Sequence, residues 1–464
     1  MSDKFLGMVM TPLDVQLEGL AAVMDRIAAT GATAIDCGRS LNLAAPAGEG
    51  HRAPPVDIDG TRRVFDRPVW GKRELQLYNY AVDEPDLALY EDTPYKPSPQ
   101  PLPAELDRDI PAKIYEDARR RGWKVYNSAS PLVIPGLKDE DQMRWVDGAI
   151  PDPQRRVARQ GCPNAPQVRA YAIANVLDTI GQDPQIDGIC LDWLEFTTYL
   201  LEDHFLCFCD HCRRHMGELG YDPVRIEEDA LILWDHLHQL TPSSLTAAAR
   251  MSRSPGEVLE LFTGHPGWLD LLRFKADAVR LAFTDIRRAM DQSGYGHVEL
   301  VANGWAPPFN RSSGMDYARL PGSVQIVRPK LYTFHWSAMP RWYGQVLQSW
   351  NPELEESALI EAVKHWCQLP DANPAPRFAH YNIPGPDEDH PVDPQTFTTR
   401  IAEVVDQVGG KIPVQILAHG YRPAHQWREK VDIVRHSAAD GMWVQRYCYL
   451  SDEKLDILSQ VWNS

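Results

Sequence analysis

The chain has 464 residues, 44% hydrophobic and 24% charged, a composition typical of a globular protein with a full core, which excludes disordered and fibrous classes. The net charge of −17 argues against a nucleic-acid groove or an anionic membrane surface, because both need a concentrated basic face. The amino terminus lacks the pattern of a secretion signal, and no apolar run approaches the roughly 18 residues of a membrane span. We therefore expect a cytoplasmic protein that binds a neutral small molecule. Its oligomeric state stays open.

Short β-branched and apolar runs alternate with amphipathic segments, a pattern typical of parallel strands joined by helices. The predicted strands are 5–10, 33–37, 124–128, 188–193, 298–303, 325–334, 414–419 and 442–447. The predicted helices are 17–29, 104–121, 166–180, 268–292, 355–368, 395–408 and 425–438. Residues 377–383 could form a ninth strand, but we assign them to a loop. Eight strands in this alternation predict the α/β class and one (β/α)8, or TIM-barrel, domain over residues 1–464.

Three connections are unusually long, at about 41–103, 196–267 and 337–394. Each follows a strand and precedes its helix, so all three are expected on the face at the carboxyl ends of the strands. Barrel proteins build their sites on this face, and long loops in compact domains are more often functional than idle. The functional site is therefore predicted there.

Two carboxylates follow the fourth predicted strand, Asp192 at its end and Glu195 three residues later. Cleavage of a glycosidic bond needs one carboxyl group as proton donor and another as nucleophile or base. Asp192 and Glu195 are close enough in sequence to share one pocket. The structural alternative is that Asp192 only pairs with an arginine such as Arg39, since buried carboxylates are usually paired.

Further polar and aromatic residues end the other predicted strands. Any one of them alone is more typical of a satisfied structural group, but their joint placement indicates a substrate-binding site. Tryptophans in the same connections have flat faces that suit sugar rings, although such rings most often fill loop packing. The candidates for substrate binding are Asp36, Arg39, Asn127, Asn303, Trp305, Tyr332, His335, His419 and Arg446, and the other tryptophans are Trp193, Trp336, Trp342 and Trp350.

A cysteine motif lies in the second long connection, with Cys207, Cys209 and Cys212 at positions i, i+2 and i+5. Three thiolates at this spacing can converge on one tetrahedral zinc ion, which requires a fourth ligand. The sequence does not choose among Cys162, His204, His211 and His215; we take Cys162 as the working choice. Such a site is expected to be structural, with no cofactor for catalysis. The alternative is a set of free cysteines that pack an ordered loop.

Three stretches together resemble the hypothetical glycosyl-hydrolase-like barrel families, relatives of the α-amylase-type and α-galactosidase-type glycoside hydrolases. They are the run from Asp187 to Asp192, the cysteine motif, and Met216 with Gly220-Tyr221-Asp222. The resemblance implies that Asp192 is the covalent nucleophile. It does not supply the acid, because Asn303 stands where α-amylase-like enzymes place a glutamate; Glu195 or Asp316 would have to donate the proton.

The sequence thus predicts a glycoside hydrolase or related carbohydrate-processing enzyme acting on small saccharides or glycosides. A second hypothesis is a metal-dependent isomerase, epimerase or lyase, in which Asp192, Glu195, His335 and His419 hold a divalent ion. A third is a carbohydrate-binding barrel without chemistry, which the missing acid after the fifth strand favours.

Overall fold

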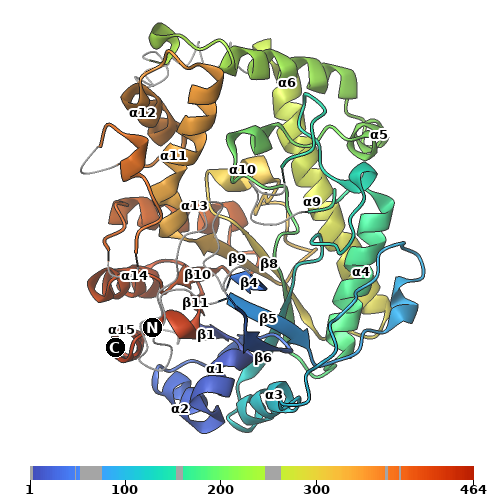
Figure 1. The fold of residues 1–464 in the computed structure, drawn as a ribbon, viewed down its shortest axis with the longest axis vertical. Helices are drawn as coiled ribbons and strands as arrows, with labels where there is room; N and C mark the ends of the chain where they lie inside the picture. Colours follow the sequence, from blue (N-terminus) through green and yellow to red (C-terminus); the bar gives the residue numbers. More distant parts are fainter. Residues whose placement is uncertain are drawn as a thin grey trace.

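The computed structural model describes residues 4–46, 49–52, 76–152, 160–245, 263–370, 375–385 and 388–464. Eight parallel strands close into a barrel in which neighbours in the chain are neighbours in space (Figure 1). This confirms the predicted (β/α)8 class. The strands are β1 (Phe5–Met10), β2 (Ala34–Cys37), β6 (Lys124–Ala129), β7 (Gly188–Leu191), β8 (Glu299–Trp305), β9 (Ile326–Leu331), β10 (Gln415–His419) and β11 (Gly441–Gln445).

The strand bounds differ from prediction mainly in the middle of the chain. β8 runs two residues further, to Trp305, whereas β9 ends at Leu331 because a helix begins at Thr333. Residues 378–380 form a short 3-10 turn, in agreement with the assignment of 377–383 to a loop.

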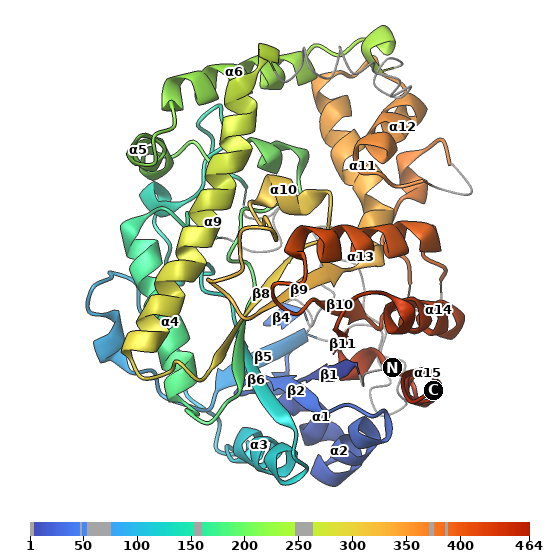
Figure 2. The same ribbon diagram turned by 180° about the vertical axis from the view of Figure 1, so that it is seen from behind.

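Helices surround the barrel, and α4 and α9 lie side by side on its outside (Figure 2). Seven of them follow the predicted amphipathic segments. The sequence did not predict α1, α5, α6, α10, α11 and α15 as separate helices. The helices are α1 (Pro12–Glu18), α2 (Leu20–Ala29), α3 (Ile110–Arg120), α4 (Pro166–Gly181), α5 (Asp210–Glu218), α6 (Pro223–Leu237), α9 (Pro266–Gln292), α10 (Phe309–Ser313), α11 (Thr333–Trp350), α12 (Glu356–Trp366), α13 (Pro394–Val408), α14 (Ala424–His436) and α15 (Asp452–Trp462).

The long connections carry structure of their own. The first contains an antiparallel sheet of β3 (Ser40–Ala44), β5 (Gln76–Ala81) and β4 (His51–Arg52), in the order β3-β5-β4. The second contributes α5 and α6, and the third contains most of α11 together with α12. In Figure 1, α6, α11 and α12 gather at one end of the long axis, and α1, α2 and α3 lie at the other. Parts of all three connections lie outside the described residues.

Aromatic rings fill the part of the barrel interior around Trp443 and Tyr126. Trp443 and Tyr126 meet edge to face with ring centroids 5.0 Å apart, and two glycines make room for them. A Cβ atom on Gly7 would come within 2.4 Å of the Trp443 ring, and one on Gly188 within 2.3 Å of Tyr126. The barrel interior is therefore a packed core at this level, as in other barrels of this class.

No helix within the described residues combines the length and the apolar character needed to cross a lipid bilayer.

Candidate active site and cysteine cluster

Lys330 organises the end of the barrel at which the predicted site lies. Ile326, Arg328 and Lys330 occupy alternate positions on β9, and side chains at alternate positions of a strand share one face, here the barrel interior. The Lys330 ammonium forms an ion pair with Asp192, which follows β7. The side chain of Asp192 is 32% exposed and that of Lys330 only 8%. Asp192 therefore lies at the carboxyl end of the strands and remains open to solvent.

Glu195 lies on the other side of the same ammonium. Its Oε1 atom is 3.8 Å from Lys330 Nζ, and its Oε2 atom accepts hydrogen bonds from Ser313 Oγ at 2.7 Å and from the backbone amide of Trp305 at 3.3 Å. The side chain has no exposed surface. Burial raises the pKa of Glu195 to about 7, against the opposing effects of the Lys330 charge and of the two hydrogen bonds. Glu195 can thus hold a proton near neutral pH while Asp192 pairs with Lys330.

Aromatic rings surround these carboxylates, with Tyr199 at their centre. Its ring centroid lies 4.7 Å from that of Trp305, 5.2 Å from His335, 5.6 Å from Trp193 and 6.2 Å from Trp342. The Lys330 ammonium also lies 4.7 Å from the centre of the Trp193 ring, in a cation–π contact. Three of the five predicted tryptophans therefore meet next to Asp192.

The other two tryptophans serve packing elsewhere. Trp336 contacts Phe397 and carries the Arg400 guanidinium 4.0 Å from its ring centre. Trp350 stacks on His238 with ring centroids 3.9 Å apart, at the far end of α11. Neither belongs to the aromatic group around Tyr199, which corrects the sequence expectation for these two.

Several buried polar atoms at this end of the barrel have no hydrogen-bond partner in the described part of the chain. They are Glu195 Oε1, Trp305 Nε1 and His335 Nε2. Burial, assisted by the Lys330 charge, lowers the pKa of His335 to about 3, so its imidazole is neutral at physiological pH. Buried polar groups in folded proteins are nearly always paired, so three unpaired ones in one place indicate a site that a polar ligand completes.

The backbone is strained beside Asp192. Trp193 has φ of 64°, in the left-handed region that large side chains rarely adopt. Such outliers persist where the surrounding structure holds them, and they are common at functional sites. Here the conformation places the Trp193 ring against Tyr199 and Lys330 while Asp192 stays at the end of β7.

Tyr332, His335 and His419 join this site, as the sequence predicted for the ends of β9 and β10. The Tyr332 ring centroid lies 5.9 Å from His335 and 5.2 Å from His419. Burial and the negative charge of Asp192 raise the pKa of the Tyr332 hydroxyl, which places this group near that carboxylate. The charge of Arg446 acts on Tyr332 in the opposite direction, so Arg446 lies at the same edge.

Two predicted binding residues lie one level deeper in the barrel. Asp36 accepts hydrogen bonds from Ser128 Oγ at 2.8 Å and from Arg328 at 2.8 Å. Asn303 Oδ1 accepts a bond of 2.5 Å from Arg328 Nε. Asp36 and Asn303 are 2% and 3% exposed. Arg328 thus binds both residues, and Ser128 also binds Asp36. Their predicted contact with a ligand stays a prediction.

Arg39, Asn127 and Asp316 also depart from the predicted arrangement. Arg39 binds Asp83 through two hydrogen bonds of 2.6 and 2.9 Å, so it is not the partner of Asp192. Asn127 lies between Tyr126 and Ser128 on β6, and the side chains of these two neighbours point into the barrel. Successive side chains of a strand point to opposite faces, so the Asn127 side chain faces the surrounding helices. Its Oδ1 atom accepts a hydrogen bond of 2.8 Å from the backbone amide of Ser128.

Asp316 is held at the surface beside α9. It forms ion pairs with Arg311 at 2.8 Å and with Arg319 at 3.4 Å, and Arg319 also pairs with Asp277 of α9. The neighbouring Tyr317 points the other way and donates to the Trp305 carbonyl at 2.7 Å. The structure therefore brings Glu195, rather than Asp316, to Asp192.

The sequence reading missed Lys330, Tyr199 and Ser313. Lys330 had a visible signal, because the buried run of β9 carries basic residues at two alternate positions, Arg328 and Lys330. Charges on one face of a buried strand require partners inside the barrel. Tyr199 and Ser313 lie in loops, where no periodic pattern identifies the inward-facing side chains.

The four cysteines of the predicted metal site come together. The sulfur atoms of Cys162, Cys207, Cys209 and Cys212 lie within 4.8 Å of one another, and all four residues are buried. Cys162 Sγ is 3.4, 3.5 and 3.9 Å from the sulfurs of Cys212, Cys209 and Cys207. A tetrahedral zinc ion with Zn–S bonds of about 2.3 Å separates its sulfurs by roughly 3.8 Å. The geometry fits zinc, with Cys162 as the fourth ligand.

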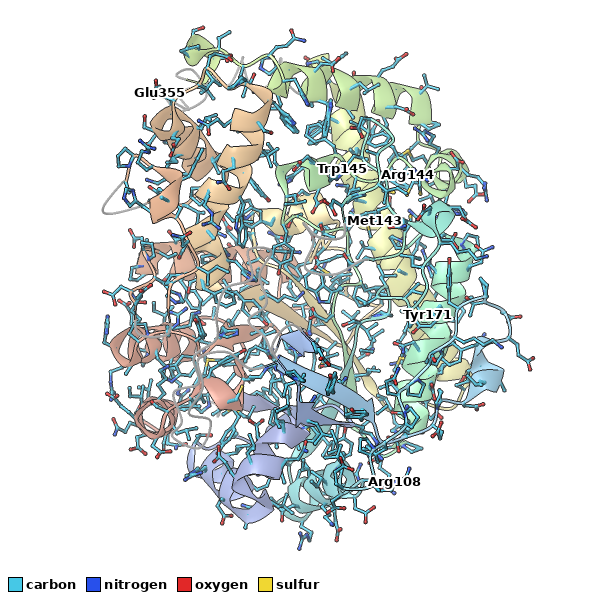
Figure 3. The ribbon with its side chains drawn as sticks, in the orientation of Figure 1. Arg108, Met143, Arg144, Trp145, Tyr171 and Glu355 are labelled. Atoms are coloured by element: carbon cyan, nitrogen blue, oxygen red, sulfur yellow. The ribbon has the colours of Figure 1, made fainter. Side chains whose placement is uncertain are left out.

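Hydrogen-bond donors face this cluster. The backbone amides of Arg144 and Asn164 each approach a sulfur at 3.5 Å, those of Cys207 and Cys162 respectively, and Asn164 Nδ2 lies 3.3 Å from Cys212 Sγ. Such donors favour thiolates over thiols. Figure 3 shows Arg144 near α5, beside Met143 and Trp145. The cluster links the segment before α4 to the connection after β7.

No other group of three metal-ligating side chains occurs in the residues that the structure describes. At the barrel end, Lys330 supplies the positive charge between Asp192 and Glu195. This arrangement gives no support to the hypothesis of a divalent metal held there with His335 and His419.

No family model matches the chain, and no curated protein matches it. Solved structures match in fold. The β-galactosidase of the Antarctic haloarchaeon Halorubrum lacusprofundi has 11% identity and a TM-score of 0.53, with 99% of this chain and 57% of that one covered. The β-galactosidase of the psychrophilic Marinomonas ef1 has 11% identity and a TM-score of 0.49, with 99% of this chain and 59% of that one covered. The catalytic domain of the Paenibacillus polymyxa β-amylase has 10% identity and a TM-score of 0.44, with 99% of this chain and 97% of that one covered.

The chain spans less than two thirds of the length of these two β-galactosidases. The likeness to the haloarchaeal enzyme shows that the two chains share the (β/α)8-barrel fold.

Proposed function

We propose that this protein is a glycoside hydrolase, or a closely related carbohydrate-processing enzyme, that acts on small saccharides or glycosides at the Asp192 end of the barrel. The observation that carries the proposal is the pairing of two unlike carboxyl groups around Lys330. One is a third exposed and ion-paired, and the other is buried with its pKa raised to about 7. Glycosidic cleavage uses such a pair, because one group must be ionised and the other protonated at the same pH.

In this proposal Asp192 acts as nucleophile or base and Glu195 as the acid. Both contact one ammonium, so the two carboxyl groups lie within about two ion-pair lengths, roughly 8 Å. A carboxyl with a pKa close to the working pH is suited to proton transfer. Glu195 is covered in this structure, and Lys330 contacts both carboxyls. In this proposal, the side chains around Glu195 rearrange when the sugar binds, so that Glu195 reaches the oxygen of a leaving group.

The remaining groups would hold the sugar. The faces of Trp193, Trp342 and Tyr199 would stack on its apolar C–H surfaces. Trp305 Nε1 and His335 Nε2, which have no partner among the described residues, would bond its hydroxyls. His335 stays neutral near pH 7 because burial holds its pKa at about 3, so it would interact as a hydrogen-bonding group without charge.

Replacement of Asp192 tests the proposal. With the aryl glycosides that a substrate panel identifies, Asp192→Asn is expected to lower kcat by about 10²- to 10⁴-fold. The matched control is Asp285→Asn, because Asp285 also forms an ion pair, with Arg169, and its side chain is also 32% exposed. Equal activities of Asp192→Asn and the control would contradict the proposal. Activity that disappears with a chelator and returns with magnesium would favour the metal-dependent class instead.

A carbohydrate-binding barrel without chemistry is the second candidate, favoured by the complete burial of Glu195. It predicts saccharide binding by the wild type and by Asp192→Asn in calorimetry, with no turnover of any panel substrate by either.

We also propose that Cys162, Cys207, Cys209 and Cys212 hold a structural zinc ion, which would tie the connection after β7 to the segment before α4. Elemental analysis of the purified protein is expected to give one zinc per chain. Cys209→Ser should lose the metal and unfold at a lower temperature, because structural zinc contributes directly to folding. Cys367→Ser, which removes a buried thiol outside the cluster, should keep the zinc. A metal-free wild type with an unchanged Cys209→Ser melting temperature would contradict this site.

A further inference from the structure

Two buried cations lie together in a pocket between α13 and α14. Arg422, in the segment after β10, is 4% exposed, and Lys430 of α14 is 2% exposed. Lys430 Nζ donates to the Leu331 carbonyl at 3.0 Å and lies 4.7 Å from the centre of the Phe397 ring. Within the described residues, neither cation has an Asp or Glu oxygen within ion-pair distance. Burial lowers the pKa of Arg422 to about 9, although the charge of Glu429 acts against this shift, and burial together with the Arg422 charge lowers the pKa of Lys430 well below its usual range. A closer counter-charge would offset this cost of burial.

A histidine completes the same pocket. His390 is 3% exposed, and its Nδ1 atom lies 2.9 Å from Thr333 Oγ1, to which Arg422 also donates. His390 Nε2 and Arg422 Nε have no hydrogen-bond partner in the described part of the chain. Burial and the nearby charges of Arg422 and Lys430 hold the pKa of His390 well below its usual range. Two unpaired nitrogens thus accompany the two cations, which form no ion pair with the described residues.

The space left in this basic pocket, defined by Thr333, His390, Arg422 and Lys430, is small. It measures about 30 Å³ for a water-sized body, which admits one water or halide ion and is far below the several hundred Å³ of an organic ligand site. Two carboxylate residues line its rim, Asp393 and Glu429, and both are exposed. The size and the charge together point to a small anion.

We propose that the basic pocket binds one inorganic anion of the size of chloride, held by the guanidinium of Arg422, the ammonium of Lys430 and the free nitrogen of His390. The anion would supply the charge that the buried cations lack and the partner that the two nitrogens lack. Thr333 and Arg422 belong to the segments that follow β9 and β10, so the ion would join these segments to α14.

The pocket lies directly behind the proposed active site. Thr333 follows Tyr332 in the chain, and the His390 ring centroid lies 6.4 Å from that of Phe334. Phe334 packs against His335 at 4.3 Å and His419 at 4.7 Å. An anion in the pocket would thus fix the position of the side chains that form one wall of the site. The proposal itself does not depend on the activity of that site.

Anion-dependent stability tests the proposal without any substrate. Melting temperatures are measured in sodium chloride and in sodium gluconate at equal ionic strength, since gluconate is too large for the pocket. Chloride is expected to raise the melting temperature of the wild type by roughly 2–5 °C over gluconate. Bromide should act like chloride, and phosphate should add nothing beyond gluconate.

Two variants and one control locate the effect. Arg422→Gln and Lys430→Met should each abolish the difference between chloride and gluconate. Arg428→Gln should keep it, because Arg428 lies on the same helix but is exposed and bonds Gln460. The ³⁵Cl NMR signal gives a direct measure: the wild type should broaden it, and bromide should compete this broadening away.

Three results would overturn the inference. They are equal melting temperatures of the wild type in chloride and gluconate without ³⁵Cl broadening, a shift that persists in Arg422→Gln, and a shift caused by phosphate but not by chloride. If Arg422→Gln fails to fold, Lys430→Met and the ³⁵Cl signal of the wild type still decide the question.

Discussion

Arg328 and Lys330 occupy consecutive inward positions of β9, yet their surroundings differ. Arg328 is 2% exposed, bonds Asp36 and Asn303, and lies 5.0 Å from the centre of the Trp443 ring. Lys330 meets a carboxylate that is a third exposed, and next to it are buried polar atoms without partners. One strand thus carries a basic residue that the barrel supplies with a carboxylate and an amide oxygen, with Nη1 alone unpaired among the described residues. Two positions on, it carries a lysine beside which several buried polar atoms have no partner in the described part of the chain.

This difference in surroundings distinguishes residues that stabilise the fold from residues that can bind a ligand. A buried charge that is paired with its counter-charge has little to gain from a ligand, and its removal leaves the partner buried without compensation. A partly exposed pair with unpaired neighbours can gain from a ligand. The degree of pairing at each level of the barrel therefore indicates which residues hold the fold and which await a substrate.

The largest expected effect is on stability. Arg328→Met should lower the free energy of unfolding by about 3–5 kcal/mol, because it leaves Asp36 buried without its cation. Lys330→Met should cost only about 1 kcal/mol, because water can solvate Asp192 in its place. Urea unfolding followed by circular dichroism measures both variants. Equal losses, or a larger loss for Lys330→Met, would contradict the division between the two levels.

A smaller effect concerns pH. The pKa of Glu195 is raised by burial to about 7, whereas an unfolded glutamate titrates near 4.3. Between these values the folded protein holds one proton more than the unfolded chain, so Glu195 makes stability fall as pH rises. Glu195→Gln should remove a loss on the order of 2 kcal/mol between pH 4.5 and 7.

The measurement is the difference between the wild type and Glu195→Gln, each unfolded in urea across this pH range. The difference is needed because His335, with its pKa lowered to about 3, contributes the opposite slope: its unfolded form binds the extra proton between about 3 and 6.5. Parallel pH profiles for the two proteins would show that Glu195 is ionised at neutral pH in the folded state.

The smallest effect concerns substrate affinity. Trp342→Ala removes a ring from the group around Tyr199 and is expected to raise the KM of a panel substrate about five- to tenfold, equivalent to roughly 1 kcal/mol of stacking. Trp350→Ala, which removes a ring stacked on His238, should change KM less than twofold. Initial-rate kinetics on both variants, with folding checked by circular dichroism, decide between them. A larger change in KM for Trp350→Ala would contradict the assignment of the stacking surface.

The barrel fold was predictable because each of its eight strands has its own local signal. The eight barrel strands are short apolar runs, and the amphipathic segments between them have helical period, so pattern alone identified them. Asp192 was predictable for the same reason, since the end of a buried strand is a defined position. Three sulfurs of the cysteine cluster followed from the i, i+2, i+5 spacing, whereas the sequence left the fourth position open between Cys162 and three histidines.

The site around Asp192 was less predictable, because orientation within a loop changes with every residue. Asp316 and Tyr317 are neighbours, yet one faces Arg311 at the surface and the other the Trp305 carbonyl. Arg39 finds Asp83, 44 positions away, across the first long connection. Neither pairing produces a periodic pattern in the sequence. The alternation of Arg328 and Lys330 does produce such a pattern, and it indicates polar partners inside the barrel.

The closure of the barrel has a consequence for how the protein folds. Every seam joins strands that follow one another in the chain except the one between β1 and β11, where Phe5 lies opposite Gly441 and Val9 opposite Gln445. Until β1 and β11 pair, an open sheet of these strands has two unpaired edges. Exposed edges template aggregation, so the pairing of the first barrel strand with the last protects both edges at once.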